Sequence, residues 1–493
     1  MKTIFTWICI SLFSPILFAQ KDYREQYRPQ VHFSPRLHWM NDPNGMVFYK
    51  GIYHLFFQYY PGASVWGPMH WGHATSSDLV HWKQQPVALS PDMLGYIFSG
   101  SAVVDSENTS GFGINGTPPL VAIYTNHDTA GEHAKTNTFQ YQSIAFSNDN
   151  GFTWKKYKGN PVLKNPGITD FRDPSVMWYA PEKKWVMTLA TKDHITFYSS
   201  ENLKEWNKES EFGQNIGAHS GVWECPNLFS ISDRNKIEWV LITSIGSGAP
   251  NGGSGTQYFL GSFDGHQFTP KDSLIRWIDY GPDDYAGVTW NNTGSRKIFL
   301  GWMSNWLYAM KVPTTGWRSA MTIPRQLALK YVDSNMYVSS EPVAETKLTE
   351  DKAAVKNVNL TSKGHYLYLP CRIDMEASAK DFVIALKNDI NEKVLIGYNA
   401  VKNQYYIDRT HSGKNTFYQG FAAIETAPRL SHNSLMNVSL IIDESSIEFF
   451  ADDGLTVMTV LFFPGKPYTT ISYGKLKGQS IKTFTFIPLK SIW

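Results

Sequence analysis

The sequence predicts an all-β fold, a five-bladed β-propeller followed by a C-terminal β-sandwich. Three observations lead to this prediction: helical periodicity is scarce, short β-rich runs alternate with clusters of Gly, Pro, Asn and Asp, and one strand–turn–aromatic phrase recurs along the chain. At 493 residues the chain exceeds one typical hydrophobic core. We therefore expect two domains of unequal size.

The first residues have the features of an export signal. An early Lys is followed by an apolar run from Ile4 to Phe18 and by a small residue, Ala19, where a signal peptidase would cut. The run is short for a spanning helix, and strongly polar sequence follows at once. We expect residues 1–19 to be a cleaved signal peptide and the mature protein to be periplasmic or extracellular, without a membrane span.

Composition narrows the possible partners. Lys and Arg number 45 against 43 Asp and Glu, and a net charge of +2 gives no field that would attract nucleic acid or a membrane surface. The 17 Trp residues suit packing between short strands, and they equally suit flat apolar faces against which sugar rings lie. After the leader only Cys225 and Cys371 remain, too few for a disulfide framework and without metal-ligand spacing.

The recurring phrase marks the expected propeller blades within residues 24–341. It occurs as ATSSDLVHW, AFSNDNGFTW, YSSENLKEW and GSFDGHQF, which end at Trp82, Trp154, Trp206 and Phe268. Each phrase is expected to close a unit of roughly fifty to seventy residues, a length that suits four-stranded blades with loop insertions. A fifth unit, residues 285–325, follows without so clear an ending, so five blades are expected.

From about Val355 the pattern changes to longer alternating strands. The segment SIEFFADDGLTVMTVLFF predicts a hairpin that turns at Asp452, Asp453 and Gly454. A polar, charged stretch, EPVAETKLTEDKAA, precedes this part of the chain. We expect residues 342–354 to form a linker and residues 355–493 to form the β-sandwich.

Three acidic residues stand just before predicted inner strands. Asp42 precedes GMVFY, Asp173 in FRDP precedes SVMWY, and Glu224 in WECP precedes NLFSI. The innermost strand of each propeller blade begins near the central axis, so these carboxylates are expected to converge on one funnel. The Asp-Pro-Asn-Gly sequence that begins at Asp42 is by itself only a turn signal.

Carboxylates that converge in this way indicate acid/base chemistry. They would repel one another if all were ionised, so either a metal neutralises them or one stays protonated. The alternating oxygen ligands of a calcium loop are absent and His70 with His73 is a weak zinc pair, so we expect neither a metal nor another cofactor. Glycoside hydrolysis uses such acids: one attacks or activates water while another protonates the leaving oxygen.

The motifs WMNDPNG, FSGSAVV, FRDP and WECP, in this order, resemble the defining motifs of glycoside hydrolase family 32, the invertases, inulinases and levanases. GSFDG, DYGPDDYAG, GWMSNW, WRSAMTIPR and SIEFFADDG also resemble family segments, so the resemblance covers nearly all of the mature chain. The family's five-bladed propeller and β-sandwich agree with the prediction above. One departure is Asp284, where relatives commonly carry an aromatic residue, and it bears on any role of Tyr285.

The resemblance implies a role for each acid. Asp42 would be the nucleophile, Glu224 the general acid and then base, and Asp173 the transition-state stabiliser that bonds fructose hydroxyls. β-D-Fructofuranosyl linkages of levan, inulin or sucrose would be cleaved with retention, which requires the two reacting carboxyl groups to lie about 5 Å apart. The family motifs also imply hydroxyl partners and apolar walls around the reacting carbon: Asn41, Gln58, Ser99 and Arg172, and Trp66, Phe98 and Trp302.

Several alternatives remain at this stage. We expect exo action that releases fructose, with an endo-levanase or endo-inulinase as the alternative and transfer to a second sugar as a further outcome of retaining chemistry. An inverting arabinofuranosidase or xylosidase would lack WMNDPNG and the sandwich, and a sialidase would require more arginines than FRDP supplies. A glycan-binding propeller without turnover would have no need of three acids.

Overall fold

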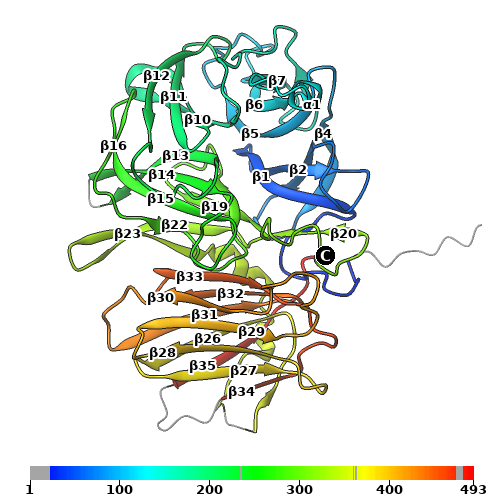
Figure 1. Cartoon of the computed structure of the whole chain (residues 1–493), viewed down its shortest axis with the longest axis vertical. Coiled ribbons are helices and arrows are strands. Elements are labelled where there is room, and N and C mark those ends of the chain that lie inside the picture. The colour runs from blue at the N-terminus through cyan, green and yellow to red at the C-terminus, as the bar shows by residue number, and fades with distance from the viewer. Residues whose placement is uncertain (1–22, 234–235, 359, 361–362, 474–480) are drawn as a thin grey trace, which may run out of the picture.

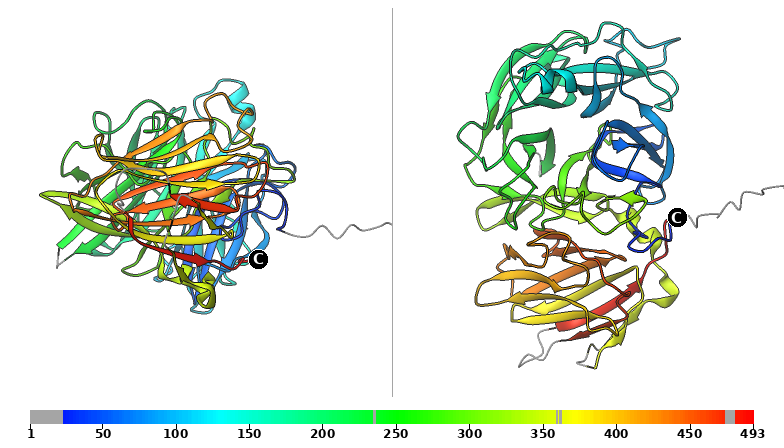
Figure 2. Two further views of the ribbon diagram at one scale, coloured as in Figure 1. Left: turned by 90° about the horizontal axis from the view of Figure 1, so that it is seen from below. Right: turned by 45° about the vertical axis from the view of Figure 1, so that its right-hand side comes forward.

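The chain forms a ring of β-sheets that stands on a two-layered β-sandwich (Figure 1). The structure is a computed structural model, and it describes residues 23–233, 236–358, 360, 363–473 and 481–493. Figure 2 shows the ring from a second side, with the sandwich packed against one edge of it. The predicted fold class, a five-bladed propeller followed by a sandwich, is confirmed.

Five sheets of four or five strands form the blades within the described residues. Blades one and two contain β1 (His38–Tyr49), β2 (Ile52–Tyr60), β3 (His70–Ser76) and β4 (Lys83–Leu89), then β5 (Tyr96–Val104), β6 (Leu120–His127), α1 (Thr129–His133), β7 (Gln140–Ser147) and β8 (Lys155–Lys156). Blade three contains β9 (Phe171–Tyr179), the 3₁₀ turn Ala180–Glu182, β10 (Lys184–Thr191), β11 (His194–Ser200) and β12 (Asn207–Phe212).

Blades four and five complete the ring. Their strands are β13 (Trp223–Asp233), β14 (Lys236–Ile245), β15 (Gly255–Phe263), β16 (Phe268–Pro270) and β17 (Arg276–Trp277), then β18 (Tyr285–Thr289), β19 (Lys297–Met303), β21 (Ala320–Met321), β22 (Arg325–Val332) and β23 (Asn335–Pro342). The short strand β20 (Trp317–Arg318) pairs in parallel with the start of β1. This late segment thereby joins the last blade to the first and closes the ring.

The sandwich consists of two six-stranded sheets within the described residues. One sheet contains β24 (Lys356–Asn357), β35 (Ile481–Pro488), β26 (Cys371–Ser378), β31 (Leu435–Ile442), β32 (Ser446–Ala451) and β33 (Thr456–Leu461). The other contains β25 (His365–Tyr366), β34 (Thr470–Tyr473), β27 (Phe382–Lys387), β28 (Lys393–Asn399), β29 (Gln404–His411) and β30 (Ile424–Pro428). Two 3₁₀ segments, Ala344–Thr349 and Lys352–Ala354, precede it.

Hydrophobic side chains hold neighbouring blades together. Val121 and Ile144 of blade two pack with Val176 and Met187 of blade three, and similar clusters fill the other spaces between blades. A separate cluster fills the space between the sandwich sheets. Because each blade packs on its two neighbours in the ring, the positions of the inner strands depend on the closed ring.

The blade boundaries differ in detail from the sequence prediction. The recurring phrases do not close the blades; a fourth strand follows each of them, such as β4 after Trp82 and β12 after Trp206. The fifth blade runs past Arg325 to Pro342 because β23 pairs with β22. The hairpin at Asp452–Gly454 is present between β32 and β33, which pair from Ala451 and Thr456 onward. The outer strands β4 (KQQPVAL) and β12 (NKESEF) are largely polar, so apolar alternation did not mark them in the sequence.

The propeller and the sandwich share a buried ionic junction. Arg325 of β22 donates to Glu448 of β32 through Nε at 2.9 Å, and its Nη1 contacts Asp279 and Asp284, each at 2.9 Å. His32, which precedes β1, bonds Asp443 at 2.7 Å and Glu448 at 2.9 Å through its two ring nitrogens. Every one of these side chains is at most 1% exposed. Breaking one partner would therefore leave an uncompensated buried charge.

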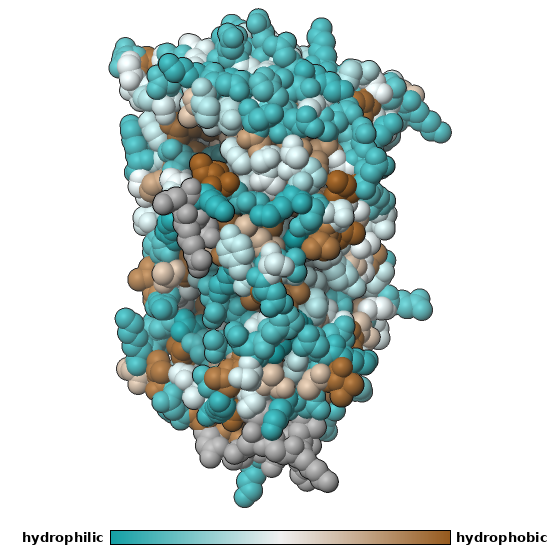
Figure 3. Space-filling view, turned by 90° about the vertical axis from the view of Figure 1, so that its left-hand side faces the viewer, coloured by the Kyte–Doolittle hydropathy of each residue, from teal (hydrophilic) through white to brown (hydrophobic). Residues whose placement is uncertain are grey.

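The surface shown in Figure 3 is mainly hydrophilic, with apolar side chains scattered singly or in small groups. No helix among the described residues is long and apolar enough to cross a bilayer. The expected signal peptide, residues 1–19, lies outside the described residues.

The junction makes stability depend on the protonation of His32. Burial lowers the pKa of His32, but hydrogen bonds and charges of Asp443 and Glu448 outweigh it and raise the pKa to about 9. Because the folded pKa exceeds the unfolded value near 6.5, the stabilisation is fully present below pH 6.5 and is lost as the pH rises through about 9. The shift corresponds to about 3 kcal/mol.

We predict that His32→Gln lowers the melting temperature most near pH 6 and scarcely at all near pH 10. Differential scanning calorimetry of both proteins across this range measures the difference. His81→Gln serves as the matched control, because His81 bonds only the local Asp78 and its side chain is 54% exposed. A His32 effect of constant size at every pH would contradict the prediction.

Candidate active site

The first strand of every blade contains a β-bulge. The first strands contact one another in the order β1, β5, β9, β13, β18 and back to β1, so they surround the axis of the ring. Each loses register with its neighbour near its start: Met40–Pro43, Asn44–Val47, Ile97–Gly100, Arg172–Ser175, Glu224–Asn227 and Tyr285–Val288. A bulge breaks the alternation of side chains and re-aims them.

The bulges place residues in the left-handed region of backbone space. Asp173 has φ +63°, Cys225 +48°, Ala286 +54° and Gly45 +56°. For residues other than Gly or Asn this conformation is uncommon, and it persists where the surrounding structure imposes it. The Asp-Pro-Asn-Gly sequence is thus not a turn between strands, as a local interpretation suggested; it lies inside the twelve-residue strand β1.

Asp42 is fixed through both of its carboxylate oxygens. The Asn41 side-chain amide donates to Oδ1 at 2.9 Å and the Ser99 hydroxyl donates to Oδ2 at 2.8 Å. Asn41 is itself held by the indole N–H of Trp39 at 2.7 Å. Burial raises the pKa of Asp42 and the charge of Glu224 raises it further, while the Asn41 and Ser99 hydrogen bonds lower it. The carboxylate is therefore oriented and stabilised by neutral donors.

Glu224 is held from two sides. Arg172 donates to Oε1 through Nε at 3.1 Å and Nη2 at 3.0 Å, and its Nη1 bonds Asp170 at 2.5 Å. The Tyr285 hydroxyl donates to Oε2. Both oxygens of Glu224 are thus engaged, one by a cation and one by a phenol.

Asp173 is held by the backbone of the neighbouring blade four. The backbone N–H of Cys225 donates to its Oδ2 at 3.1 Å, and the Cys225 thiol lies 3.6 Å from Asp42 Oδ2 and 3.7 Å from Asp173 Oδ2. Burial raises the pKa of Asp173 to about 7, with Arg172 opposing the shift and Glu224 adding to it. Burial also raises the pKa of the Cys225 thiol well above its usual value, so the sulfur remains a neutral donor between two carboxyls.

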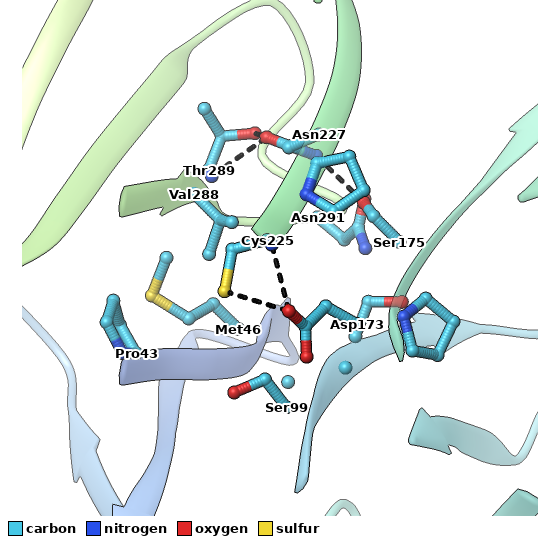
Figure 4. Close-up of a pocket in the computed structure, with 15 residues that line it drawn as sticks. Pro43, Met46, Ser99, Asp173, Ser175, Cys225, Asn227, Val288, Thr289 and Asn291 are labelled. Atoms are coloured by element: carbon cyan, nitrogen blue, oxygen red, sulfur yellow. Dashed lines mark hydrogen bonds between the residues drawn. The ribbon is translucent and has the colours of Figure 1, made fainter. Parts of the chain in front are cut away.

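A small chamber lies on the inner side of these acids, along the axis of the ring. Figure 4 shows Asp173 and Ser99 facing it together with Cys225, whose bonds to Asp173 are dashed. Its volume is about 20 Å³, and Asn227 and Ser175 add polar groups to its wall. A water molecule needs about 10–15 Å³ of such space, so the chamber has room for one.

The acids open on the other side into a cavity of about 350 Å³, a size typical of small-molecule sites. Nine of the ten residues singled out from the sequence line it: Asn41, Asp42, Gln58, Trp66, Phe98, Ser99, Arg172, Asp173 and Glu224. They come from blades one to four, and ring closure alone brings them together. Further lining residues that the sequence did not reveal are His127, Glu132, Phe139, Gln140, Thr169, Asp170 and Trp306.

Trp302 differs from its expected position in the cavity wall. Its ring is fully buried, and its indole N–H donates to the carbonyl of Met40 at 3.1 Å. Trp306 lines the cavity instead, with its ring centroid 4.8 Å from that of Trp302. Trp302 lies within β19 and points into the core, whereas Trp306 follows the end of that strand, where the chain is free to turn towards the opening.

Tyr285 is the functional candidate that the departure at Asp284 obscured. Asp284 binds Arg325 in the ionic junction, and the adjacent Tyr285 points the other way, towards Glu224.

The sequence offered a clue to Trp306, because the GWMSNW segment contains both Trp302 and Trp306. Residue type alone does not show which of the two tryptophans lines the cavity. His127, Gln140 and Glu132 belong to no sequence motif.

The described residues contain no cluster of three or more His, Cys, Asp or Glu side chains suited to holding a metal ion.

Comparison with known proteins identifies the family. Residues 32–341 match the profile of the glycosyl hydrolases family 32 N-terminal domain, and residues 338–488 match that of the family 32 C-terminal domain. The chain belongs to glycoside hydrolase family 32. It is therefore a glycoside hydrolase, which sets aside the arabinofuranosidase, sialidase and non-catalytic alternatives.

Its family 32 relatives match over most of their length. The levanase of Bacillus subtilis is 45% identical over 511 residues, which cover 99% of this chain and 74% of that protein. The crystal structure of exo-inulinase from Aspergillus awamori superposes with a TM-score of 0.89 at 38% identity, covering 96% of this chain and all of that one. A β-fructofuranosidase from Schwanniomyces occidentalis, complexed with fructosyl-erythritol, has a TM-score of 0.86 at 33% identity, covering 95% and 99% of the two chains.

Gln58 provides a test that separates binding from stability. Its side chain lines the cavity and is buried, yet its Nε2 has no hydrogen-bond partner among the described residues. An unsatisfied buried amide destabilises the folded protein, whereas in a substrate complex it could donate to a hydroxyl. We predict that Gln58→Met lowers kcat/KM by about tenfold or more and leaves the melting temperature unchanged or raised.

Steady-state kinetics and calorimetry of the same preparation measure both quantities. Gln142→Met is the matched control, because both ends of the Gln142 amide are bonded, to Thr125 and to the Phe171 carbonyl. That variant should lose stability. A Gln58→Met protein with full activity would remove Gln58 from the binding site.

Proposed function

We propose that the protein is an exported, exo-acting β-fructofuranosidase that removes terminal fructose from levan, inulin or sucrose with retention of configuration. The observation that carries the proposal is the convergence of Asp42, Asp173 and Glu224 from three blades on one cavity, with the orienting bonds described above. The names of the relatives, levanase and exo-inulinase among them, support the substrate class.

In the first half of the proposed reaction, Asp42 attacks the anomeric C2 of a terminal fructosyl unit. The bond from C2 to the leaving oxygen breaks as Glu224 gives that oxygen its proton, and Asp173 bonds the ring hydroxyls as positive charge develops. The fructosyl unit is then an ester of Asp42. Because Asn41 and Ser99 are neutral donors, they orient the attacking carboxylate without adding a cation that would weaken it.

In the second half, water attacks C2 and Glu224 takes its proton, while the ester bond to Asp42 breaks. Glu224 must therefore cycle between its two protonation states. Arg172 donates to one carboxyl oxygen of Glu224 and the Tyr285 hydroxyl donates to the other, so both groups orient the side chain that exchanges the proton.

Exo action is supported by the arrangement of the walls. Side chains from several blades surround the acids, among them Trp66 from blade one, Phe139 from blade two and Trp306 from blade five. A cavity with walls from several blades suits the end of a fructan chain better than an internal fructosyl unit. An endo-levanase or endo-inulinase is the alternative.

We further propose that cleavage near Ala19 releases the mature enzyme, and that residues 24–341, 342–354 and 355–493 are the propeller, linker and sandwich. The end of the N-terminal profile at residue 341 supports the boundary after the propeller. Relatives that are named extracellular exo-inulinases support export.

The direct test is product release by wild type and by two near-isosteric variants. Wild type should release fructose from levan, inulin or sucrose. Asp42→Asn and Glu224→Gln should each lose activity by at least about a thousandfold, because each lacks one half of the acid/nucleophile pair. Binding of fructan by wild type without any product would overturn the proposal.

The product profile decides the mode of action. With levan and inulin digested separately, exo action predicts fructose as the sole early product, whereas a ladder of oligosaccharides from either polymer would indicate endo action. Comparison of the two initial rates gives the linkage preference.

A further inference from the structure

A chain of hydrogen bonds runs from the FRDP segment to the outer wall of the cavity. The backbone N–H of Phe171 donates to Gln140 Oε1 at 2.9 Å, and Gln140 Nε2 lies 3.3 Å from His127 Nδ1. His127 Nε2 lies 3.0 Å from Glu132 Oε2. These residues belong to β9, β7, the end of β6 and α1. The chain thus connects the residue before Arg172 to a carboxylate on a different blade.

The direction of each bond follows from the first one. Gln140 Oε1 can only accept, so the amide orientation is fixed and Nε2 is the donor to His127. His127 Nδ1 is then the acceptor, and the proton of the neutral ring is on Nε2, which donates to Glu132. Burial lowers the pKa of His127, which agrees with a neutral ring. Glu132 is held by one oxygen, and no described residue donates to its Oε1.

Aromatic side chains form the wall beside Glu132. The His127 ring stacks on Phe98 with centroids 4.3 Å apart and planes within 10°, and the Trp66 ring meets Phe98 edge-on at 6.2 Å. Aromatic faces beside a carboxylate are the groups that proteins use to bind sugar rings and hydroxyl groups.

The exposed fractions of the side chains distinguish the depth of the cavity from its opening. Asp173 is 5% exposed and the His127 side chain 4%, whereas the Glu132 side chain is 49% exposed although it lines the same cavity. Trp66 is likewise 37% exposed. The fructosyl unit that reacts must reach Asp173 and the half-buried Asp42 and Glu224, whose side chain is 24% exposed, so the sugar attached to it lies further out, towards Glu132 and Trp66.

We propose that Glu132 is a specificity-determining residue that binds the hydroxyl groups of the departing sugar and, after it has left, of an incoming acceptor sugar. This inference rests on the proposed retaining function. By microscopic reversibility, the departing sugar and the acceptor sugar bind at the same position. In transfer, the bond from C2 to Asp42 breaks, a bond from the acceptor oxygen to C2 forms, and the acceptor's proton passes to Glu224.

The partition of the fructosyl-enzyme between a sugar and water tests this directly, with sucrose as both donor and acceptor. Each cleavage releases one glucose, hydrolysis also releases one fructose, and transfer releases none. The excess of glucose over fructose, divided by fructose, is the ratio of transfer to hydrolysis. Both outcomes consume the same intermediate, so the ratio does not depend on how much of a variant is folded.

At high sucrose concentration we expect a measurable ratio for wild type and a drop of about tenfold for Glu132→Ala, the effect of losing a charged hydrogen-bond acceptor. Glu132→Gln, which keeps one oxygen acceptor without the charge, should lie between them. Glu107→Ala is the matched control, since Glu107 is exposed beyond the end of β5 and does not line the cavity.

An unchanged ratio in Glu132→Ala would overturn the inference, as would a wild-type ratio indistinguishable from zero. Either result would leave the proposed function standing if wild type still releases fructose. Failure of the proposed function is a different outcome, in which wild type releases neither glucose nor fructose from sucrose and no fructose from levan or inulin.

Discussion

The β-bulge at the start of each inner strand is the constraint on which the site depends. In a regular strand, successive side chains point to opposite faces. Yet three pairs of consecutive residues on the inner strands line the same cavity: Asn41 and Asp42, Phe98 and Ser99, and Arg172 and Asp173. The register shifts at these positions make this possible. Without them, one member of each pair would point into the packing between strands, and the nucleophile or its orienting partner would be lost.

The closed ring determines where the bulges meet, and the sandwich anchors one part of it. The junction at Arg325 joins Glu448 of the sandwich to Asp279 and Asp284, which lie just before β18. Tyr285, the next residue after Asp284, donates to Glu224. The segment that orients the acid/base residue is thus held by charges buried against the second domain. Asp284, which departs from the family pattern, has a structural role in this junction, and the contact of Tyr285 with Glu224 is kept.

The sequence permitted prediction of the fold class and of most cavity residues, because blades repeat and because the motifs are continuous in sequence. It could not show that Asp-Pro-Asn-Gly belongs to a strand, since a bulge and a turn use the same residue types. Trp302 lies within β19 and Trp306 lies beyond its end, and the sequence does not show where this strand ends. His127, Glu132 and Gln140 lie close together in sequence but belong to no motif, and the pairing of β6 with β7 and the position of α1 determine their contacts.

The central claim is that acids from separate blades meet at one carbon, close enough for direct attack. The stereochemistry of methanolysis tests it most directly, because a methyl fructoside keeps the configuration formed at C2. With methanol present, the account predicts methyl β-D-fructofuranoside as the first-formed product, identified by NMR, and its absence in Asp42→Asn. Formation of the α-anomer would mean that water or methanol attacks the substrate directly, with the carboxylates further apart, and would contradict the account.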